Sequence, residues 1–233
     1  MKLALIGYGA MGQMVFNQAT AVGDQIGLKI TSRDSERGVD DLAELLRGHD
    51  VAIDFSVGAA VLGHIEACVR AAVPLVEGTT GWKDKEAEAR SVIQEGNGTL
   101  AYGANFSIGV NIFYRIVGQA SALFQCISEY EPFIEEAHHS RKRDAPSGTA
   151  LRLREIMAEC FEEREISIAS TRAGYIPGTH RVGFDSSADQ IVLAHTARSR
   201  EGFAAGALLA ARWIIGKKGI YEFSEVIDEI LQG

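Results

Sequence analysis

A cluster of titratable and basic side chains marks the middle of the chain. Within six residues it contains His138, His139, Arg141, Lys142 and Arg143. Histidine exchanges protons near neutral pH, and lysine and arginine bind carboxylates. In a chain of net charge −8 this local cluster predicts a site for a small polyanionic substrate, because the overall charge does not favour nucleic acid or an anionic membrane. A solvated basic loop before a helix is the alternative interpretation.

The residues after this cluster predict a helix start that binds an anion. Pro146 and Ser147 favour the first positions of a helix, so Gly148 and Thr149 would carry free N–H groups in its first turn. Gly148 has no side chain to block an approaching group, and the Thr149 hydroxyl adds a donor. We therefore expect Gly148 and Thr149 to bind a substrate carboxylate.

Two adjacent histidines could also indicate a metal site. However, side chains at neighbouring strand positions point to opposite faces, and no H-x-x-x-H or C-x-x-C spacing accompanies His138 and His139. The sequence shows no set of three ligands, so we expect no metal.

A glycine-rich turn near the N-terminus predicts a nicotinamide dinucleotide. It lies between a β-rich run and a helical pattern, the context in which G-x-G-x-x-G is informative. The glycines permit the tight turn, the approach of the pyrophosphate and close helix packing, and the helix start attracts the anion. A flavin, another nucleotide or an ordinary turn are the alternatives. The predicted cofactor-binding residues of the turn are Gly7, Tyr8, Gly9, Ala10, Met11 and Gly12.

The second strand bears on the choice of cofactor. Ser32 and Arg33 stand where an acid usually binds the ribose 2′-hydroxyl, and a small hydroxyl with an arginine can instead hold a 2′-phosphate. This predicts a preference for NADPH, with NADH possible, although Asp34 is close enough to weaken the prediction. Two later strand ends should complete the cofactor crevice, with the residues Gly78, Thr79, Thr80, Tyr102, Gly103, Ala104 and Asn105.

The order of the elements predicts how these residues are positioned. The first hundred residues alternate β-rich and helical runs, which is typical of an α/β Rossmann-type doubly wound parallel sheet. The predicted strands are Lys2 to Ile6, Ile26 to Thr31, Val51 to Phe55, Leu75 to Glu77 and Thr99 to Tyr102. The predicted helices are Met11 to Ala21, Asp41 to Leu46, Ala59 to Ala72 and Lys83 to Glu95.

The alternation of β-rich and helical runs ends after residue 104. We therefore expect a second, α+β domain with an open mixed sheet over residues 105–202. It would contain helices at 107–124 and 147–160, a long run at 128–137, and strands at 165–171, 180–184 and 190–196. Residues 203–233 read as helical and would finish either this domain or the dinucleotide-binding domain of residues 1–104.

The composition agrees with a cytoplasmic enzyme. Hydrophobic residues make up 46% of the 233 residues, and the three cysteines, Cys68, Cys126 and Cys160, show neither disulfide nor zinc spacing. No stretch resembles a signal peptide or a membrane span.

Taken together, these motifs resemble the 4-hydroxy-tetrahydrodipicolinate reductase family, also called dihydrodipicolinate reductase, over nearly the whole chain. The most specific matching segment runs from Glu136-Ala137-His138-His139 through Lys142 to Asp144-Ala145-Pro146-Ser147-Gly148-Thr149-Ala150. Further matches are Glu77 to Gly81, Asn105 to Asn111, Arg172 to Gly174, Gly178 to His180 and His195 to Ala204.

The resemblance implies NAD(P)H-dependent reduction of a cyclic dicarboxylate in lysine and diaminopimelate synthesis, by a homotetramer whose last helix rejoins the first domain. It implies that His138 and Lys142 donate protons, and that His139, Gly148 and Thr149 bind substrate. His180 and His195 are assigned supporting roles. The rival hypotheses are another two-domain NAD(P) oxidoreductase of amino-acid metabolism and a non-catalytic dinucleotide sensor, which would have no use for His138 and Lys142.

Overall fold

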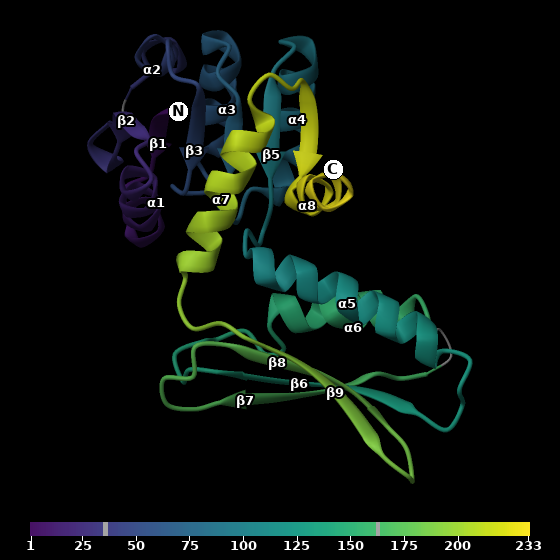
Figure 1. Ribbon diagram of the computed structural model, residues 1–233. Helices are drawn as coiled ribbons and strands as arrows, with labels where there is room; N and C mark the ends of the chain where they lie inside the picture. The colour runs from purple at the N-terminus through teal and green to yellow at the C-terminus, as the bar shows by residue number, and fades with distance from the viewer. Residues whose placement is uncertain (35–36, 162–163) are drawn as a thin grey trace. The chain divides into compact units, whose positions relative to one another are not determined.

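The chain leaves one folding unit after Ile108 and returns to it at Arg200 (Figure 1). The computed structural model describes residues 1–34, 37–161 and 164–233. The first unit comprises Met1–Ile108 and Arg200–Gly233, and the second comprises Gly109–Ser199.

A six-stranded parallel sheet forms the centre of the first unit, in the order β10-β5-β4-β3-β1-β2. Five of its strands match the predicted ones to within one residue. The strands are β1 (Lys2–Ile6), β2 (Gln25–Ile30), β3 (Val51–Asp54), β4 (Leu75–Glu77), β5 (Thr99–Tyr102) and β10 (Gly219–Glu222).

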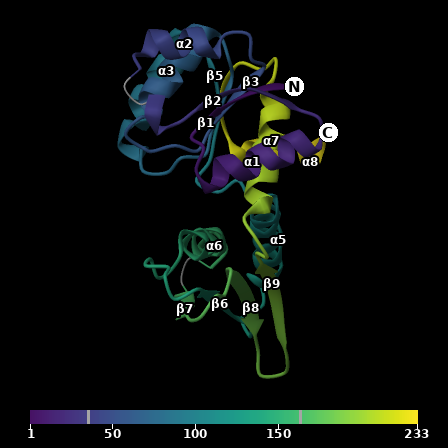
Figure 2. The ribbon, with the colours of Figure 1, turned by 90° about the vertical axis from the view of Figure 1, so that its left-hand side faces the viewer.

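Helices cover both faces of this sheet (Figure 2). Alternate strand residues point to opposite faces, so Leu3 and Leu5 join one apolar core while Ala4 and Ile6 join the other. The first core is completed by α1 (Ala10–Ala21), α7 (Glu201–Ile214) and α8 (Phe223–Gln232). The second is completed by α2 (Val39–Leu46), α3 (Val61–Ala71) and α4 (Glu86–Glu95), and short 3-10 turns lie at η1 (Ser32–Asp34) and η2 (Lys83–Lys85). The predicted doubly wound α/β fold is confirmed.

The prediction of a wholly helical tail is wrong, because residues 203–233 contain the strand β10. Gly216 and Gly219 adopt positive φ angles of 82° and 118°, which end α7 and turn the chain. The residues after this turn extend beside β5, with Ile220 opposite Leu100. The tail therefore supplies the last strand of the first unit's sheet.

A mixed four-stranded sheet forms the second unit, in the order β7-β6-β8-β9, and it confirms the predicted α+β fold with a mixed sheet. Two helices cover one face and bury Ile134, Val182 and Phe184 (Figure 1). The elements are α5 (Ile108–Phe124), β6 (Glu131–His138), α6 (Gly148–Ala158), β7 (Ser167–Arg172), β8 (Thr179–Asp185) and β9 (Gln190–Thr196). None of the helices in the described ranges is long and apolar enough to cross a membrane.

Candidate active site

The predicted cofactor residues lie at or just after the carboxyl ends of β1, β2, β4 and β5, with Ala10, Met11 and Gly12 in the first turn of α1 and Tyr102 at the end of β5. Because these strands are parallel neighbours, their carboxyl ends meet at one edge of the sheet. The chain crosses from one side of β1 to the other between β2 and β3, which makes the β1/β3 junction the switch point where such sheets bind nucleotides.

The geometry of the glycine turn fits a dinucleotide. Gly7 has a φ of 84°, and a Cβ there would lie 2.4 Å from the carbonyl oxygen of Phe55. A Cβ on Gly12 would lie 2.1 Å from the carbonyl oxygen of Gly7, whereas one on Gly9 would have no atom within 4 Å. Gly9 also caps α1 without a side chain. Open space therefore faces the first N–H groups of α1, where a pyrophosphate binds.

The sequence analysis missed the loop at residues 55–58, which follows β3 at this switch point. Its backbone contacts Gly7 on one side, and a Cβ on Gly58 would lie 2.5 Å from the carbonyl oxygen of Gly81 on the other. The Phe55 ring packs on Gly78, and a Cβ on Gly78 would lie 2.1 Å from Cε1 of this ring. The loop thus joins the glycine turn to the loop after β4, and its role depends on the strand order, which periodicity does not reveal.

Several predicted cofactor residues use their side chains within the protein. The Thr79 hydroxyl accepts the N–H of Ser56, and the Asn105 side chain accepts the N–H of Ser107. The Tyr102 hydroxyl bonds with Arg90 and Glu86 of α4. These three residues therefore offer a cofactor mainly their backbone, while Thr80 and Ala104 are exposed.

In the turn after β2, Arg33 is exposed to solvent, whereas Asp34 is bonded within the protein. Ser32 and Arg33 are exposed, whereas the Asp34 carboxylate accepts the N–H of Thr31 at 3.0 Å and pairs with Arg37 at 3.0 Å. The Thr31 N–H and the Arg37 guanidinium lower the pKa of Asp34. The acid that weakened the prediction of NADPH is thus engaged within its own turn.

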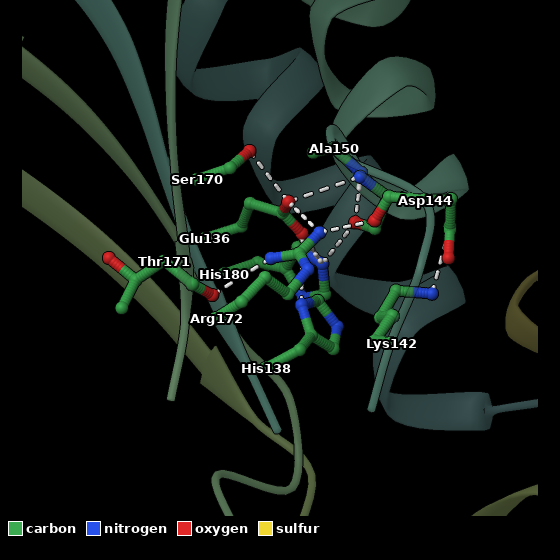
Figure 3. A network of polar contacts seen from close by, with 10 residues as sticks. Glu136, His138, Lys142, Asp144, Ala150, Ser170, Thr171, Arg172 and His180 are labelled. Carbon is green, nitrogen blue, oxygen red and sulfur yellow. Dashed lines mark hydrogen bonds and ion pairs between the residues drawn. The ribbon is translucent and has the colours of Figure 1, made fainter. Parts of the chain in front are cut away.

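In the second unit, a buried carboxylate organises the basic cluster (Figure 3). Glu136 is 3% exposed, and its Oε1 accepts the N–H of Ser147 at 3.1 Å and the hydroxyl of Ser170 at 2.7 Å. The Arg172 guanidinium donates to the same oxygen at 2.6 Å. Oε2 lies 3.0 Å from Nδ1 of His138, a close contact whose angle is not that of a hydrogen bond. Strand register produces this arrangement, because Glu136 is opposite Ser170 on β7 and His180 on β8.

Burial shifts the pKa values of Glu136 and His138 in opposite directions, because it disfavours the charged form of each. Burial by itself would raise the pKa of Glu136, but the hydrogen bonds from Ser147, Arg172 and Ser170 outweigh it and lower the pKa to about 2. Burial lowers the pKa of His138, and although Glu136 opposes this shift, the nearby cations reinforce it. At neutral pH the free protein therefore holds an ionised Glu136 beside a neutral His138.

His180 supports the same network from β8. Burial, reinforced by the neighbouring His138, lowers its pKa to about 4, so the ring is neutral and can accept from the Ser147 hydroxyl at 3.0 Å. The Ser147 hydroxyl oxygen in turn accepts the N–H of Ala150, which caps α6. The rings of His180 and His138 meet edge to face at 5.1 Å. His180 thus connects the cap of α6 to the His138 ring.

The loop from Lys142 to Ser147 brings the remaining predicted residues to this network. Lys142 pairs with Asp144 at 2.9 Å, and the carbonyl oxygen of Asp144 accepts from Arg172 at 2.6 Å. Ser147 is the N-cap of α6, so Gly148 and Thr149 occupy its first turn as predicted, and a Cβ on Gly148 would have no atom within 4 Å. His139 directly follows β6. His195 lies farther along the sheet, opposite His180, with its ring 5.9 Å from that of Phe113.

The sequence predicted that no three potential metal ligands lie together, and the structure shows that this prediction is wrong. Potential ligand atoms of Glu136, His138 and His180 lie within 4.8 Å of one another. The spacing could not reveal this set, because His180 comes from another strand. Arg172 already balances the charge of Glu136, so we assign the three side chains to the polar network.

Glu136, Ser170 and Arg172 were given no role in the sequence analysis. A signal for Glu136 was present, because it lies two residues before His138 and so shares its face of the strand. Ser170 and Arg172 required the pairing of β7 with β6.

Known proteins match this chain along its whole length. The family model described as "Dihydrodipicolinate reductase, N-terminus" matches residues 1–106, and "Dihydrodipicolinate reductase, C-terminus" matches residues 109–227. A 4-hydroxy-tetrahydrodipicolinate reductase of Christiangramia forsetii is 37% identical over 100% of both chains. One of Methanoregula boonei is 38% identical over 76% of this chain and 74% of the relative.

Solved structures share the fold. A dipicolinate-bound dihydrodipicolinate reductase from Paenisporosarcina sp. TG-14 has a TM-score of 0.77 at 20% identity, covering 95% of this chain and 97% of the other. An amine dehydrogenase from Mycobacterium smegmatis has a TM-score of 0.64 at 10% identity, covering 96% and 95%. The fold is thus shared by dehydrogenases of different names.

The ionised Glu136 should stabilise the protein measurably. We expect Glu136→Gln to lower the free energy of unfolding at pH 7 by about 2 to 4 kcal/mol, because Arg172 loses its buried counter-charge. Since the pKa of Glu136 is about 2 in the fold and 4.5 ordinarily, its contribution is complete above pH 4.5 and is lost as the pH falls toward 2. Urea unfolding at pH 7 and pH 3.5 should show the difference between wild type and variant narrowing at the lower pH.

Glu155→Gln is the control, because Glu155 is exposed on α6, where it pairs with Arg152, and should change stability by less than about 0.5 kcal/mol. Equal effects of the two substitutions would contradict the role assigned to Glu136.

Proposed function

The chain belongs to the dihydrodipicolinate reductase family, and we propose that His138 and Lys142 are the proton donors of its reaction. It is an oxidoreductase that uses NAD(P)H to reduce 4-hydroxy-tetrahydrodipicolinate to tetrahydrodipicolinate in lysine and diaminopimelate biosynthesis. The balanced reaction consumes one proton with the reduced cofactor and releases water. The predicted reaction class is confirmed by the family match.

One observation carries the assignment of the residues. The buried Glu136 joins the His138 ring and the start of α6, while Arg172 links this network to the loop of Lys142. A proton donor, a cation and an anion-binding helix start therefore lie together in the second unit. A non-catalytic dinucleotide sensor would not need this arrangement.

A nicotinamide dinucleotide held at the carboxyl ends of β1, β2, β4 and β5 would supply a hydride to ring C4 of the substrate. The electron density that develops on the ring must then be protonated, and His138 and Lys142 stabilise it and provide the proton. His138 is neutral in the free protein, so its proton must be acquired when the dicarboxylate brings negative charge to the site. Glu136 holds the ring through its close contact at Nδ1 and favours the charged form.

The start of α6 binds one substrate carboxylate. The Ser147 side chain caps the N–H of Ala150, and Gly148 and Thr149 occupy the first turn of α6, where backbone N–H groups can bind an anion. The open space above Gly148 supports this assignment. His139, directly after β6, is proposed to contact the same substrate.

The cysteines do not support a thiol-dependent dehydrogenase. All three are free, and burial raises the pKa of the Cys68 and Cys160 thiols, which disfavours the nucleophilic thiolate. Free thiols are typical of reducing compartments, and we propose a cytoplasmic enzyme.

A homotetramer is proposed through the second unit. Among the described residues no helix covers the outer face of its sheet, which carries Gly183 and the exposed residues Val192 and Ala194. The strand β9 also forms one edge of this sheet. An uncovered face and an exposed edge are features that association with further copies would bury.

Steady-state kinetics test the proton donors. With freshly prepared 4-hydroxy-tetrahydrodipicolinate and NADPH, His138→Gln and Lys142→Ala should each lower kcat by about 10² to 10⁴, because each removes a proton donor. NADPH affinity, measured by calorimetry, should not change. Arg152→Ala is the control, since Arg152 is exposed on α6 and pairs with Glu155. Wild-type turnover by the His138 and Lys142 variants would overturn the assignment.

Cofactor preference tests the turn after β2. NADPH should bind more tightly than NADH, and Arg33→Ala should reduce this ratio by about 10-fold, because the 2′-phosphate loses its cation. Arg47→Ala, which changes another exposed arginine of the first unit, should leave the ratio unchanged. An unaltered ratio in Arg33→Ala would exclude Arg33 as the residue that selects the cofactor.

Light scattering after size exclusion tests the assembly. Four copies of a 25.1-kDa chain have a mass of about 100 kDa. Val192→Asp places a charge on the uncovered sheet face and should reduce this mass, whereas Val22→Asp, at an exposed valine of the first unit, should not. A wild-type monomer would refute the proposal.

A further inference from the structure

A second group of buried polar side chains lies in the first unit, apart from the proton donors. Asp54 and Glu77 are 0% and 1% exposed and end the neighbouring strands β3 and β4, where they are direct cross-strand partners. His64 of α3 contacts the Asp54 carboxylate, with Nδ1 2.7 Å from Oδ2. Two carboxyl groups and an imidazole are thus enclosed at the cofactor edge of the sheet.

These two carboxyl groups cannot both be ionised without a large cost, because they are adjacent and removed from water. Because the His64 imidazole contacts the Asp54 carboxylate, Glu77 is the member of the pair that retains a proton. Burial and the negative charge of Asp54 raise the pKa of Glu77 well above its usual value. Glu77 Oε1 accepts the N–H of Thr79 at 2.6 Å, whereas Oε2 has no hydrogen bond among the described residues, and a proton there can be donated to Asp54.

The carboxyl pair fastens two loops of the cofactor crevice. The N–H of Ser56 donates to Asp54 Oδ1 at 2.8 Å and to the Thr79 hydroxyl at 3.0 Å. On the other side, the N–H of Thr79 is held by Glu77, and the carbonyl oxygen of Thr79 accepts from the Trp82 indole at 2.9 Å. The loop after β3 and the loop after β4 are therefore both anchored on Asp54 and Glu77.

We propose that Asp54 and Glu77 are positioning residues that share one proton. Together with His64, which contacts Asp54, they hold the loops at residues 55–58 and 78–81 in the arrangement that binds the nicotinamide dinucleotide. The inference rests on the proposed use of this crevice by the cofactor. Apolar side chains could fill the same buried space, but they would remove the carboxylate acceptor of the Thr79 N–H and the shorter of the two hydrogen bonds made by the Ser56 N–H. The pair thus provides acceptors at two loop positions with a single net charge.

Two substitutions at Glu77 distinguish a side chain that positions the loops by hydrogen bonds from one that only fills buried space. Glu77→Gln imitates the protonated carboxyl group, because its amide oxygen can accept from Thr79 and its NH₂ group can donate to Asp54. Its dissociation constant for NADPH should stay within about 2-fold of wild type by calorimetry. Glu77→Leu removes the acceptor of the Thr79 N–H and the proton shared with Asp54, and should weaken NADPH binding at least about 10-fold.

Cys68→Ala is the matched control for loss of packing. Cys68 is buried on α3 close enough to Asp54 and Glu77 that their charges raise the pKa of its thiol, yet it anchors neither loop. It should lower stability and leave NADPH affinity unchanged. Equal affinity of Glu77→Leu and wild type, with both proteins folded by circular dichroism, would overturn the positioning role.

A pH profile reports on the shared proton independently of activity. The titratable neighbours of Glu77 among the described residues are Asp54 of β3, Cys68 of α3 and Tyr102, its cross-strand partner on β5, and His64 contacts Asp54. Because the pKa of Glu77 is raised from 4.5, the wild-type free energy of unfolding should fall as the pH rises from 4.5 toward that pKa. Glu77→Gln should lack this part of the dependence, and identical profiles would contradict the shared proton.

The outcomes also distinguish this inference from the proposed function. If wild type bound no NADPH and reduced no substrate, the proposed function itself would fail. If wild type bound NADPH and Glu77→Leu bound it equally well, the function would stand and the positioning role would be rejected.

Discussion

The second unit depends on the burial of one negative charge at Glu136. A carboxylate removed from water is costly unless donors and a counter-charge replace its hydration. Here Ser147, at the start of α6, and Ser170 and Arg172, both on β7, provide them. Satisfying the charge therefore determines how α6, β7 and the intervening loop meet β6, and the same contacts position His138 and Lys142, the proposed proton donors.

The first unit meets a similar constraint in the opposite way. Around Glu136, donors are numerous enough to keep the carboxylate ionised, with a pKa of about 2. Around Glu77, burial and the negative charge of the neighbouring Asp54 raise the pKa, so a proton remains on Glu77. Both groups lie at the carboxyl ends of strands, where loop backbone needs an acceptor. The difference in their donors determines which of the two carries a charge.

Much of this architecture could be predicted from local patterns. The strands β1 to β5 and the capped start of α6 follow from periodicity and turn residues, and the same patterns identify the glycine turn and the basic cluster. The strand β10 was missed because its short run between glycines and α8 has little periodicity of its own. His180 and the loop at 55–58 depend on strand pairing across long sequence separations, which no local pattern encodes. The sequence predicted the proposed proton donors, His138 and Lys142, because they share one motif. It did not predict Ser170, Arg172 and His180, because they come from other strands.

The lowered pKa of His138 is consistent with the proposal that it donates a proton. A ring that was permanently charged would be held tightly by Glu136 and would release its proton less readily. Burial instead keeps the free ring neutral, while the contact with Glu136 limits the cost of charging it. In the proposed mechanism, a dicarboxylate bound beside the start of α6 would add negative charge and so raise the pKa of His138 when there is a substrate to protonate. Lys142 and Arg172 reinforce the lowering of this pKa in the free protein, although each is paired with a carboxylate, Asp144 and Glu136 respectively.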